Sequence, residues 1–122
     1  MVIFASGIMV HEAMQAAKTL EAEGISAAVL DLFTIKPLDN EAVVSWAKKT
    51  GAVVVAENHN RNGGLYDAVT QVLSEEYPVP CRCVAVEDEF GEVGPQGYLQ
   101  KRFGLTAEHI VEQTRVVLER KK

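Results

Sequence analysis

The run AVVVAE at residues 52–57 constrains the fold more than any other stretch of the chain. Three consecutive valines leave no polar face, so a strand built from them needs cover on both sides. Strands of this kind are typical of parallel sheets that carry helices on both faces. Three further apolar runs, at residues 2–6, 26–32 and 81–86, have the length of strands in the same sheet.

Helical periodicity fills the intervals between these runs. Apolar residues recur three or four positions apart, which predicts one buried face for each helix. The inner-face residues that we expect are Val10, Ala13, Ala17 and Leu20 in the first interval, Val43, Trp46 and Ala47 in the second, Leu65, Ala68, Val69, Val72 and Leu73 in the third, and Ile110, Val111, Thr114, Val117 and Leu118 near the end of the chain. Regular alternation of strand and helix predicts an α/β fold, with three layers α/β/α around a mainly parallel sheet.

Residues typical of helix ends agree with this division. Gly24 stands where a helix closes with a glycine. Asp39 and Thr106 stand where a side-chain oxygen accepts from free N–H groups at a helix start. Leu105 and Ile110 flank Thr106 in the positions of a hydrophobic staple, so we expect them to pack together.

Length and charge limit the classes of protein and of partner. The 122 residues have the size of one domain, which we take as residues 1–122. The formal charge of −5 disfavours nucleic acid and anionic membranes as partners. No apolar run approaches the roughly 18 residues of a membrane-spanning helix, and the N-terminus lacks the basic stretch of a signal peptide. We therefore expect a cytoplasmic protein.

The candidate site lies at the carboxyl ends of the first and third strands. In an open parallel sheet, ligands bind where the strand order reverses, and that point lies between these two strands if the first strand is central. Ser6 and Gly7 follow the first strand. The polar residues and glycines that end or follow the third strand are Glu57, Asn58, His59, Arg61, Gly63 and Gly64.

Two interpretations of this segment stay open. Glycines before a helix let a ligand approach the backbone, and helix N-termini attract anions, so an anion or nucleotide fits Ser6, Gly7, Arg61, Gly63 and Gly64. The spacing matches neither the dinucleotide-binding nor the P-loop fingerprint. A strand-to-helix turn with solvated polar side chains explains the same residues.

No catalytic, cofactor-binding or metal-binding set follows from the residues themselves. His59 has no adjacent serine or cysteine nucleophile. His11 begins HEAMQ, in which Gln15 replaces the second histidine of a zinc-binding helix. Cys81 and Cys83 would point to the same side of a strand, so we expect two buried thiols without a disulfide.

The acidic segment EDEFGE at residues 87–92 is followed by an expected short helix at residues 98–103. Its four acids could hold a hard cation, but they lack the spacing of an EF-hand loop, and a solvated loop is the simpler interpretation. Phe90 lies between charged residues, and we expect it in a core or at an interface. Glu92 joins it as a candidate contact.

Five motifs in order carry a family resemblance: ASG at 5–7, IKPLD at 35–39, E-x5-GG from 57 to 64, DEFGEVG at 88–94 and YLQKRFGLT at 98–106. Together they resemble the C-terminal domain of transketolase over nearly the whole chain. Deoxyxylulose-phosphate synthase and the β subunit of 2-oxoacid dehydrogenase E1 are relatives in that family. The motifs resemble most closely the transketolase branch, which includes split, two-chain forms.

The resemblance implies a role in a larger enzyme. Transketolases move a two-carbon ketol unit between sugar phosphates, and their other two domains bind thiamine diphosphate and Mg²⁺. The chain itself would bind no cofactor, would be inactive alone, and would serve assembly with the remaining transketolase domains or subunit and with a second copy. The contacts that we expect, to such a partner or to an anion, are Ser6, Gly7, Glu57, Asn58, His59, Arg61, Gly63, Gly64, Phe90 and Glu92. An anion- or nucleotide-binding regulatory module, or subunit docking in a synthase or E1 β relative, stays open as an alternative.

The chain departs from the family pattern at two places, and the second of them affects the expected fold. Tyr66 stands where many relatives carry glycine. The family domain usually begins with an antiparallel edge strand, whereas Met1 is followed directly by a run that resembles the second strand. We therefore expect four parallel strands in the order 2-1-3-4, with the edge strand missing. The unpaired edge would make the chain marginally stable or would pair with another strand.

Overall fold

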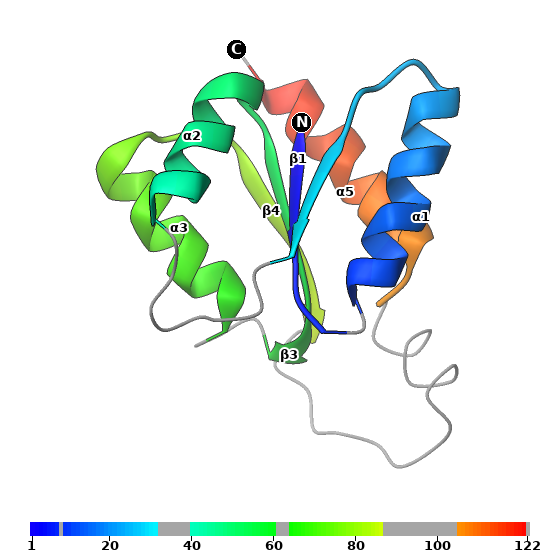
Figure 1. Ribbon diagram of the computed structural model, residues 1–122, viewed down its shortest axis with the longest axis horizontal. Helices are drawn as coiled ribbons and strands as arrows, with labels where there is room; N and C mark the ends of the chain where they lie inside the picture. Colours follow the sequence, from blue (N-terminus) through cyan, green and yellow to red (C-terminus); the bar gives the residue numbers. More distant parts are fainter. Residues whose placement is uncertain (8, 32–39, 61–63, 87–104, 122) are drawn as a thin grey trace.

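The computed structural model describes residues 1–7, 9–31, 40–60, 64–86 and 105–121. Strands and helices alternate along these segments (Figure 1). The elements are β1 (Val2–Ala5), α1 (Met9–Ala22), β2 (Ala28–Asp31), α2 (Asn40–Thr50), β3 (Val53–Asn60), α3 (Leu65–Glu76), β4 (Cys81–Val86) and α5 (Ala107–Arg120). All four predicted strands are confirmed, although β1 and β2 are shorter than predicted and β3 runs on to Asn60. The Asp39 cap and the short helix expected at 98–103 lie outside the described residues.

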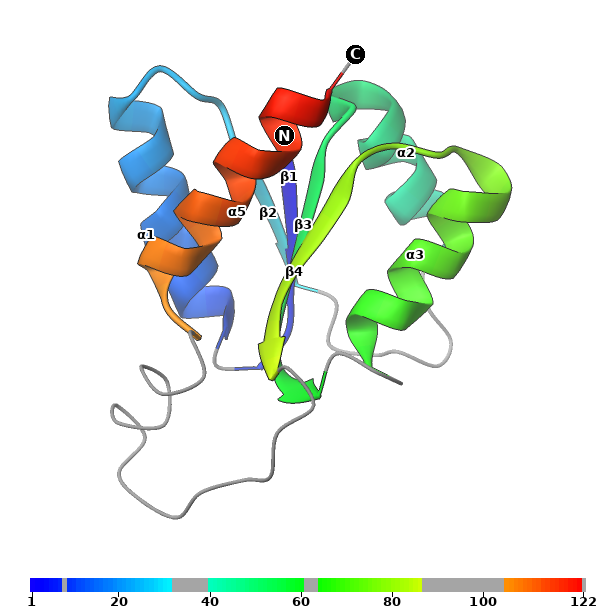
Figure 2. The same cartoon turned by 180° about the vertical axis from the view of Figure 1, so that it is seen from behind.

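The described strands form one parallel sheet in the order β2-β1-β3-β4. Helices α1 and α5 cover one face, and α2 and α3 cover the other (Figures 1 and 2). This is the predicted three-layer α/β/α fold with the predicted strand order. In the described part of the chain, β2 and β4 form the two edges of the sheet.

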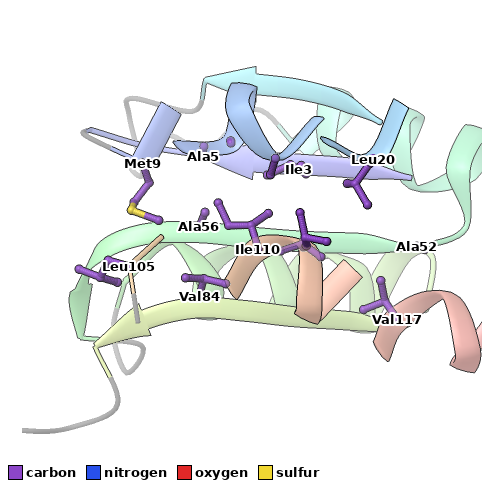
Figure 3. Packing of buried hydrophobic residues seen from close by; sticks show 14 residues of the cluster. Ile3, Ala5, Met9, Leu20, Ala52, Ala56, Val84, Leu105, Ile110 and Val117 are labelled. Carbon is purple, nitrogen blue, oxygen red and sulfur yellow. The ribbon is translucent and has the colours of Figure 1, made fainter. Parts of the chain in front are cut away.

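The valine run supplies both core layers. Val54 packs with α1 and α5, whereas Val53 and Val55 pack with α2 and α3, and all three are fully buried. Figure 3 shows Leu20 of α1 and Ile110 of α5 among the strand side chains of the first layer. Burying a side chain of this size contributes about 1.5–3 kcal/mol. The three valines of β3 therefore stabilise both hydrophobic layers of the domain.

Helix α1 buries a different stripe from the one that we expected. The buried residues are Met9, Ala13, Ala16 and Leu20. They follow one another at intervals of four, three and four, which keeps them on one face of a helix. Val10 and Ala17 lie one position off this stripe and are only half-buried.

The other helices match the expected faces at their centres. Val43 and Ala47, Leu65, Val69 and Leu73, and Ile110, Val111, Thr114 and Val117 are buried as predicted. Trp46, Ala68, Val72 and Leu118 are half-buried instead. Trp46 packs beside the second core cluster and keeps part of its ring at the surface. The Lys49 ammonium lies 4.9 Å from the centre of that ring.

The caps of α1 and α5 are confirmed. Gly24 has φ +82°, and its N–H donates to the Glu21 carbonyl at 3.0 Å. Thr106 Oγ1 accepts from the His109 N–H at 3.3 Å. Leu105 and Ile110 are both buried in the first core cluster, as the staple requires.

The two cysteines of β4 are free. Cys83 is buried as expected, whereas Cys81, at the first position of β4, is only half-buried. Burial of the sulfur and, to a smaller extent, the neighbouring Cys83 raise the pKa of Cys81 to about 12. The Cys81 thiol therefore stays protonated near neutral pH and is a poor nucleophile.

The start of β1 and the end of α5 lie together at the amino edge of the sheet, the upper edge in Figures 1 and 2. The Met1 ammonium donates to the Ser26 carbonyl at 3.0 Å at this edge. Among the described residues, no helix has both the length and the apolar character needed to cross a membrane.

Candidate functional site

The candidate site begins where β1 and β3 end side by side at the carboxyl edge. Ala5 is registered with Ala56, and the Ser6 N–H donates to the Ala56 carbonyl at 3.1 Å. Beyond this pair β1 turns away, whereas β3 continues to Asn60. The end of β3 therefore projects past the strand that supports it on one side (Figures 1 and 2).

Ser6 and Gly7 form a tight turn into α1. Gly7 has φ +58°, a conformation that favours glycine. The Ser6 carbonyl accepts from the Met9 N–H and the Gly7 carbonyl from the Val10 N–H, each at 3.2 Å. These two carbonyls serve the start of the helix, and the exposed Gly7 leaves the backbone open to close approach.

A register irregularity marks the projecting end of β3. Ala56 is opposite Val84 of β4, and Asn60 is opposite Val86. Four steps along β3 thus match two along β4, so β3 carries two extra residues between these pairs. Irregularities of this kind change the direction of the side chains next to them, and Glu57 is the first residue of this one.

Glu57 is completely buried, and its carboxylate faces the start of α3. Oε1 accepts from the Leu65 N–H at 2.9 Å, and Oε2 accepts from the Tyr66 N–H at 2.7 Å. Gly64, the residue before the helix, provides no side-chain hydrogen bond. Glu57 therefore caps α3 from the preceding strand, and its negative charge lies at the positive end of the helix.

This arrangement changes the role expected of Glu57. A side chain that is completely buried offers no surface contact in this chain, so Glu57 acts through the backbone that it holds. It also engages two of the N–H groups that would otherwise attract an external anion. Sequence analysis overlooked this role, although one signal pointed to it: a glycine without a capping side chain precedes α3, and a carboxylate ends the apolar strand before it.

The structure brings part of the predicted set together. Ser6, Gly7, Glu57 and Gly64 all lie at the carboxyl edge of the sheet, with Ser6 half-buried and Gly64 buried. Asn58 and His59 belong to β3, but their side chains lie outside the description. Arg61, Gly63, Phe90 and Glu92 lie outside the described residues altogether.

The described residues offer no metal site of the usual kind. No group of three or more histidine, cysteine, aspartate or glutamate side chains comes together among them. Thr114, the other buried polar residue in that part of the chain, donates to the Ile110 carbonyl at 2.8 Å within its own helix. Each of these two buried polar side chains thus bonds to backbone groups of the described core.

Comparison with known proteins decides the family. The family model described as "Transketolase, C-terminal domain" matches residues 1–110. The chain is a transketolase C-terminal domain. The resemblance carried by the five motifs is thus confirmed.

Two proteins with split transketolase genes or subunits are similar to this domain over its whole length. The 6-deoxy-6-sulfo-D-fructose transketolase subunit SqwH of Clostridium sp. (strain MSTE9) is 54% identical over 119 residues, which cover 98% of this chain and 37% of that subunit. A solved structure described as a split gene transketolase, inactive beta4 tetramer, is 50% identical with a TM-score of 0.94, and the match covers 99% of this chain and 40% of that one.

A second enzyme type in the family is similar at lower identity. The 1-deoxy-D-xylulose-5-phosphate synthase of Syntrophotalea carbinolica is 40% identical over 115 residues, which cover 93% of this chain and 18% of the synthase. The domain therefore spans well under half of each of these three proteins. Transketolases and deoxyxylulose-phosphate synthases are thiamine-diphosphate enzymes, and this domain is one part of that architecture.

Proposed function

We propose that this domain belongs to one subunit of a split transketolase and serves its assembly. The complete enzyme would transfer a two-carbon ketol unit between sugar phosphates. One observation carries the proposal: the split transketolase proteins match 98–99% of the chain at 50–54% identity, whereas the synthase matches at 40%. The partners would be the remaining transketolase domains or subunit, together with a further copy of the same subunit.

The contact surface that we propose is the carboxyl edge of the sheet. Its expected residues are Ser6, Gly7, Glu57, Asn58, His59, Arg61, Gly63, Gly64, Phe90 and Glu92. The projecting end of β3 and the open turn at Gly7 support this choice, because both place backbone at the rim of the sheet.

Thiamine diphosphate and Mg²⁺ would be held by other parts of the enzyme. Among the described residues, no three histidine, cysteine, aspartate or glutamate side chains come together as ligands for Mg²⁺. The N–H groups at the start of α3, where a diphosphate would be attracted, are engaged by Glu57. We accordingly assign no chemical step to this domain.

Reconstitution tests the proposal. The full-length subunit that contains this domain is mixed with its complementary subunit, thiamine diphosphate, Mg²⁺ and a ketose phosphate donor, and ketol transfer is followed. We expect transfer only when both subunits are present. Residues 1–122 alone should give no turnover and no calorimetric heat with thiamine diphosphate and Mg²⁺. Turnover by the isolated domain would contradict the proposal.

The regulatory alternative is tested separately. An anion or nucleotide that binds at the start of α3 must compete with the carboxylate of Glu57 for the Leu65 and Tyr66 N–H groups. We therefore expect phosphate and nucleotides to leave the thermal midpoint of the domain unchanged. A shift of more than about 2 °C, which corresponds to a few tenths of a kcal/mol at this length, would favour the alternative.

A further inference from the structure

We propose that helix α5 packs against the α5 of a second copy of the subunit, antiparallel across a two-fold axis. The contact runs along one stripe of the helix, formed by Glu112, Val116 and Arg120. Glu112 of each copy lies opposite Arg120 of the other, and the two Val116 side chains meet at the axis. This inference rests on the proposed function, which includes a further copy of the subunit, and names the surface that holds that copy.

The three residues of the stripe lie on one side of α5. Each follows the one before it by four positions, which turn a helix by about 40° and advance it by about 6 Å. Glu112 and Arg120 are exposed, and Val116 between them is half-buried. The helix therefore presents an apolar centre with an acid on one side and a base on the other.

Two side-chain contacts hold α5 in the domain and leave this stripe outside them. On the flank toward α1, Arg115 Nη2 donates to the two carboxylate oxygens of Glu23 at 2.9 and 3.0 Å. On the flank toward β4, Gln113 Oε1 accepts from Arg82 Nε at 2.9 Å. Figure 2 shows α5 between α1 and β4. Because the helix is attached on both flanks, the stripe has a fixed orientation relative to the sheet.

The described part of the chain does not use the stripe for its own packing. Glu112 and Arg120 form no ion pair there, in contrast to Arg115. Val116 belongs to neither core cluster and is not among the half-buried apolar residues packed against them, whereas Leu118 is. The charged and the apolar groups of the stripe are thus both available to another chain.

The stripe is complementary to itself. A two-fold interface brings the same patch of both copies together, so a contact from one residue to a second is matched by the reverse contact. With the axis at Val116, the positions four before and four after it meet, which pairs Glu112 with Arg120 twice. The positions three before and three after are Gln113 and Glu119, so an amide meets a carboxylate and no like charges are opposed. A parallel arrangement would instead place equal charges opposite each other.

The contact is small and adds to other contacts of the assembly. An exposed ion pair stabilises a contact only weakly. Helix α5 has 14 residues and is about 21 Å long, so one stripe of it buries less than the roughly 1,200–2,000 Å² of a stable interface. The stripe therefore sets the orientation of the second copy, while larger contacts of the full-length subunit supply most of the affinity.

Charge reversal in the full-length subunit tests the pairing. Glu112→Arg places two arginines opposite each other, and Arg120→Glu places two glutamates there. We expect each single variant to weaken self-association at least tenfold in analytical ultracentrifugation, or by about 1.4 kcal/mol. The double variant E112R/R120E should associate like the wild type, because opposite charges meet again. An equimolar mixture of the two single variants should also associate, since each supplies the charge that the other needs.

A cysteine at the axis gives an independent measurement. In Val116→Cys the two thiols meet across the axis, where a disulfide requires roughly 3.5–4.5 Å between the Cβ atoms. Mild oxidation should therefore give a covalent dimer on a denaturing gel. Ser45→Cys, on the exposed surface of α2, is the matched control and should give none. Glu41→Arg, also exposed on α2, is the control for charge reversal and should leave self-association unchanged.

The results separate this inference from the proposed function. Self-association that is unchanged in both single variants, or that neither the double variant nor the mixture restores, would overturn the inference. A wild-type subunit that does not self-associate, or equal cross-linking of V116C and S45C, would also overturn it. In all these cases the proposed function stands if the reconstituted subunits transfer the ketol unit. Failure of the wild-type subunits to transfer it would instead overturn the proposed function.

Discussion

Glu57 and Thr106 satisfy the free N–H groups at two helix starts over different distances. Thr106 reaches the His109 N–H three residues on, at 3.3 Å. Glu57 reaches the N–H groups of Leu65 and Tyr66, eight and nine residues on, at 2.9 and 2.7 Å. A local cap stabilises only its own helix, whereas Glu57 also connects the start of α3 to strand β3.

The Cys81 thiol gives a pH-dependent test of packing at the sheet edge. Burial raises its pKa from the ordinary value of 9.0 to about 12, with Cys83 adding to the effect. Because the folded-state pKa is the higher one, the thiol contributes stability that is complete below pH 9.0 and is lost as the pH rises toward 12. We expect the urea midpoint of the wild type to fall more over this range than that of Cys81→Ala. An equal fall of the urea midpoint in the two proteins would show that Cys81 does not contribute to this pH dependence.

At the residue scale, prediction from sequence depends on how far the partner lies along the chain. Thr106 could be identified as a cap because its partner is three residues away. The direction of Glu57 could not be predicted, since it depends on the register irregularity between β3 and β4, and that is a property of two paired strands. Sequence analysis therefore located Glu57 at the correct edge but not its buried role.

At the element scale, α5 is joined to β4 by a polar chain. Arg82 Nε donates to Gln113 Oε1 at 2.9 Å, and Gln113 Nε2 lies 3.2 Å from His109 Nε2. An arginine can only donate, so the Gln113 oxygen must face it and the amide NH₂ must face His109. The arginine thus fixes which atom donates and which accepts in both hydrogen bonds of this series. In the second, Nε2 of His109 accepts from the Gln113 amide.

Replacing Gln113 should weaken the attachment of α5 to β4. Gln113→Met keeps a side chain of similar length but removes both hydrogen bonds, and we expect a loss of about 1 kcal/mol in the free energy of unfolding. Glu112→Gln, on the exposed neighbour, is the matched control and should change it by less than about 0.5 kcal/mol. Urea denaturation measures both values. Equal losses of unfolding free energy in the two variants would mean that the hydrogen bonds of Gln113 do not stabilise the attachment of α5 to β4.

The helices also show the limits of periodicity. The existence and order of the elements followed from alternating patterns, because burial on both faces leaves a strong signal in β3. The phase of α1 was wrong by one position at two residues, Val10 and Ala17. Adjacent apolar residues leave the phase open until packing against α5 and the sheet selects one face.

At the scale of the whole molecule, the open edge of β2 is the feature most exposed to association. In the described part of the chain β2 pairs only with β1, and Ala28, Val29 and Leu30 are half-buried. The strand carries neither proline nor lysine, the residues that commonly protect an edge. This unpaired edge agrees with the strand order expected from the family resemblance.

The isolated chain should associate through this edge. We expect the sedimentation equilibrium of residues 1–122 to show a concentration-dependent mass, and Asp31→Lys, at the exposed end of β2, to reduce it by placing a lysine on the edge strand. Ser45→Lys, which adds the same charge on the exposed surface of α2, should leave association unchanged. A wild-type chain that is monomeric at every concentration would count against this expectation.

The strand order was predictable as a whole because parallel crossovers and the family motifs allow few alternatives. It places the start of β1 and the end of α5 at the amino edge and the candidate site at the opposite edge (Figures 1 and 2). The chemistry of the complete enzyme was not predictable from this chain, since no paired nucleophile and base and no metal-ligand or dinucleotide motif could be recognised in its sequence. The contribution that we propose for the domain is therefore a contact surface.

Hydrogen exchange of the assembled enzyme, compared with the free full-length subunit, tests this account most directly. The account predicts protection on assembly at residues 6–7 and 57–66 of the carboxyl edge, with little change at residues 24–27 and 77–80 of the amino edge. Protection confined to the amino edge, with the carboxyl edge unchanged, would contradict it.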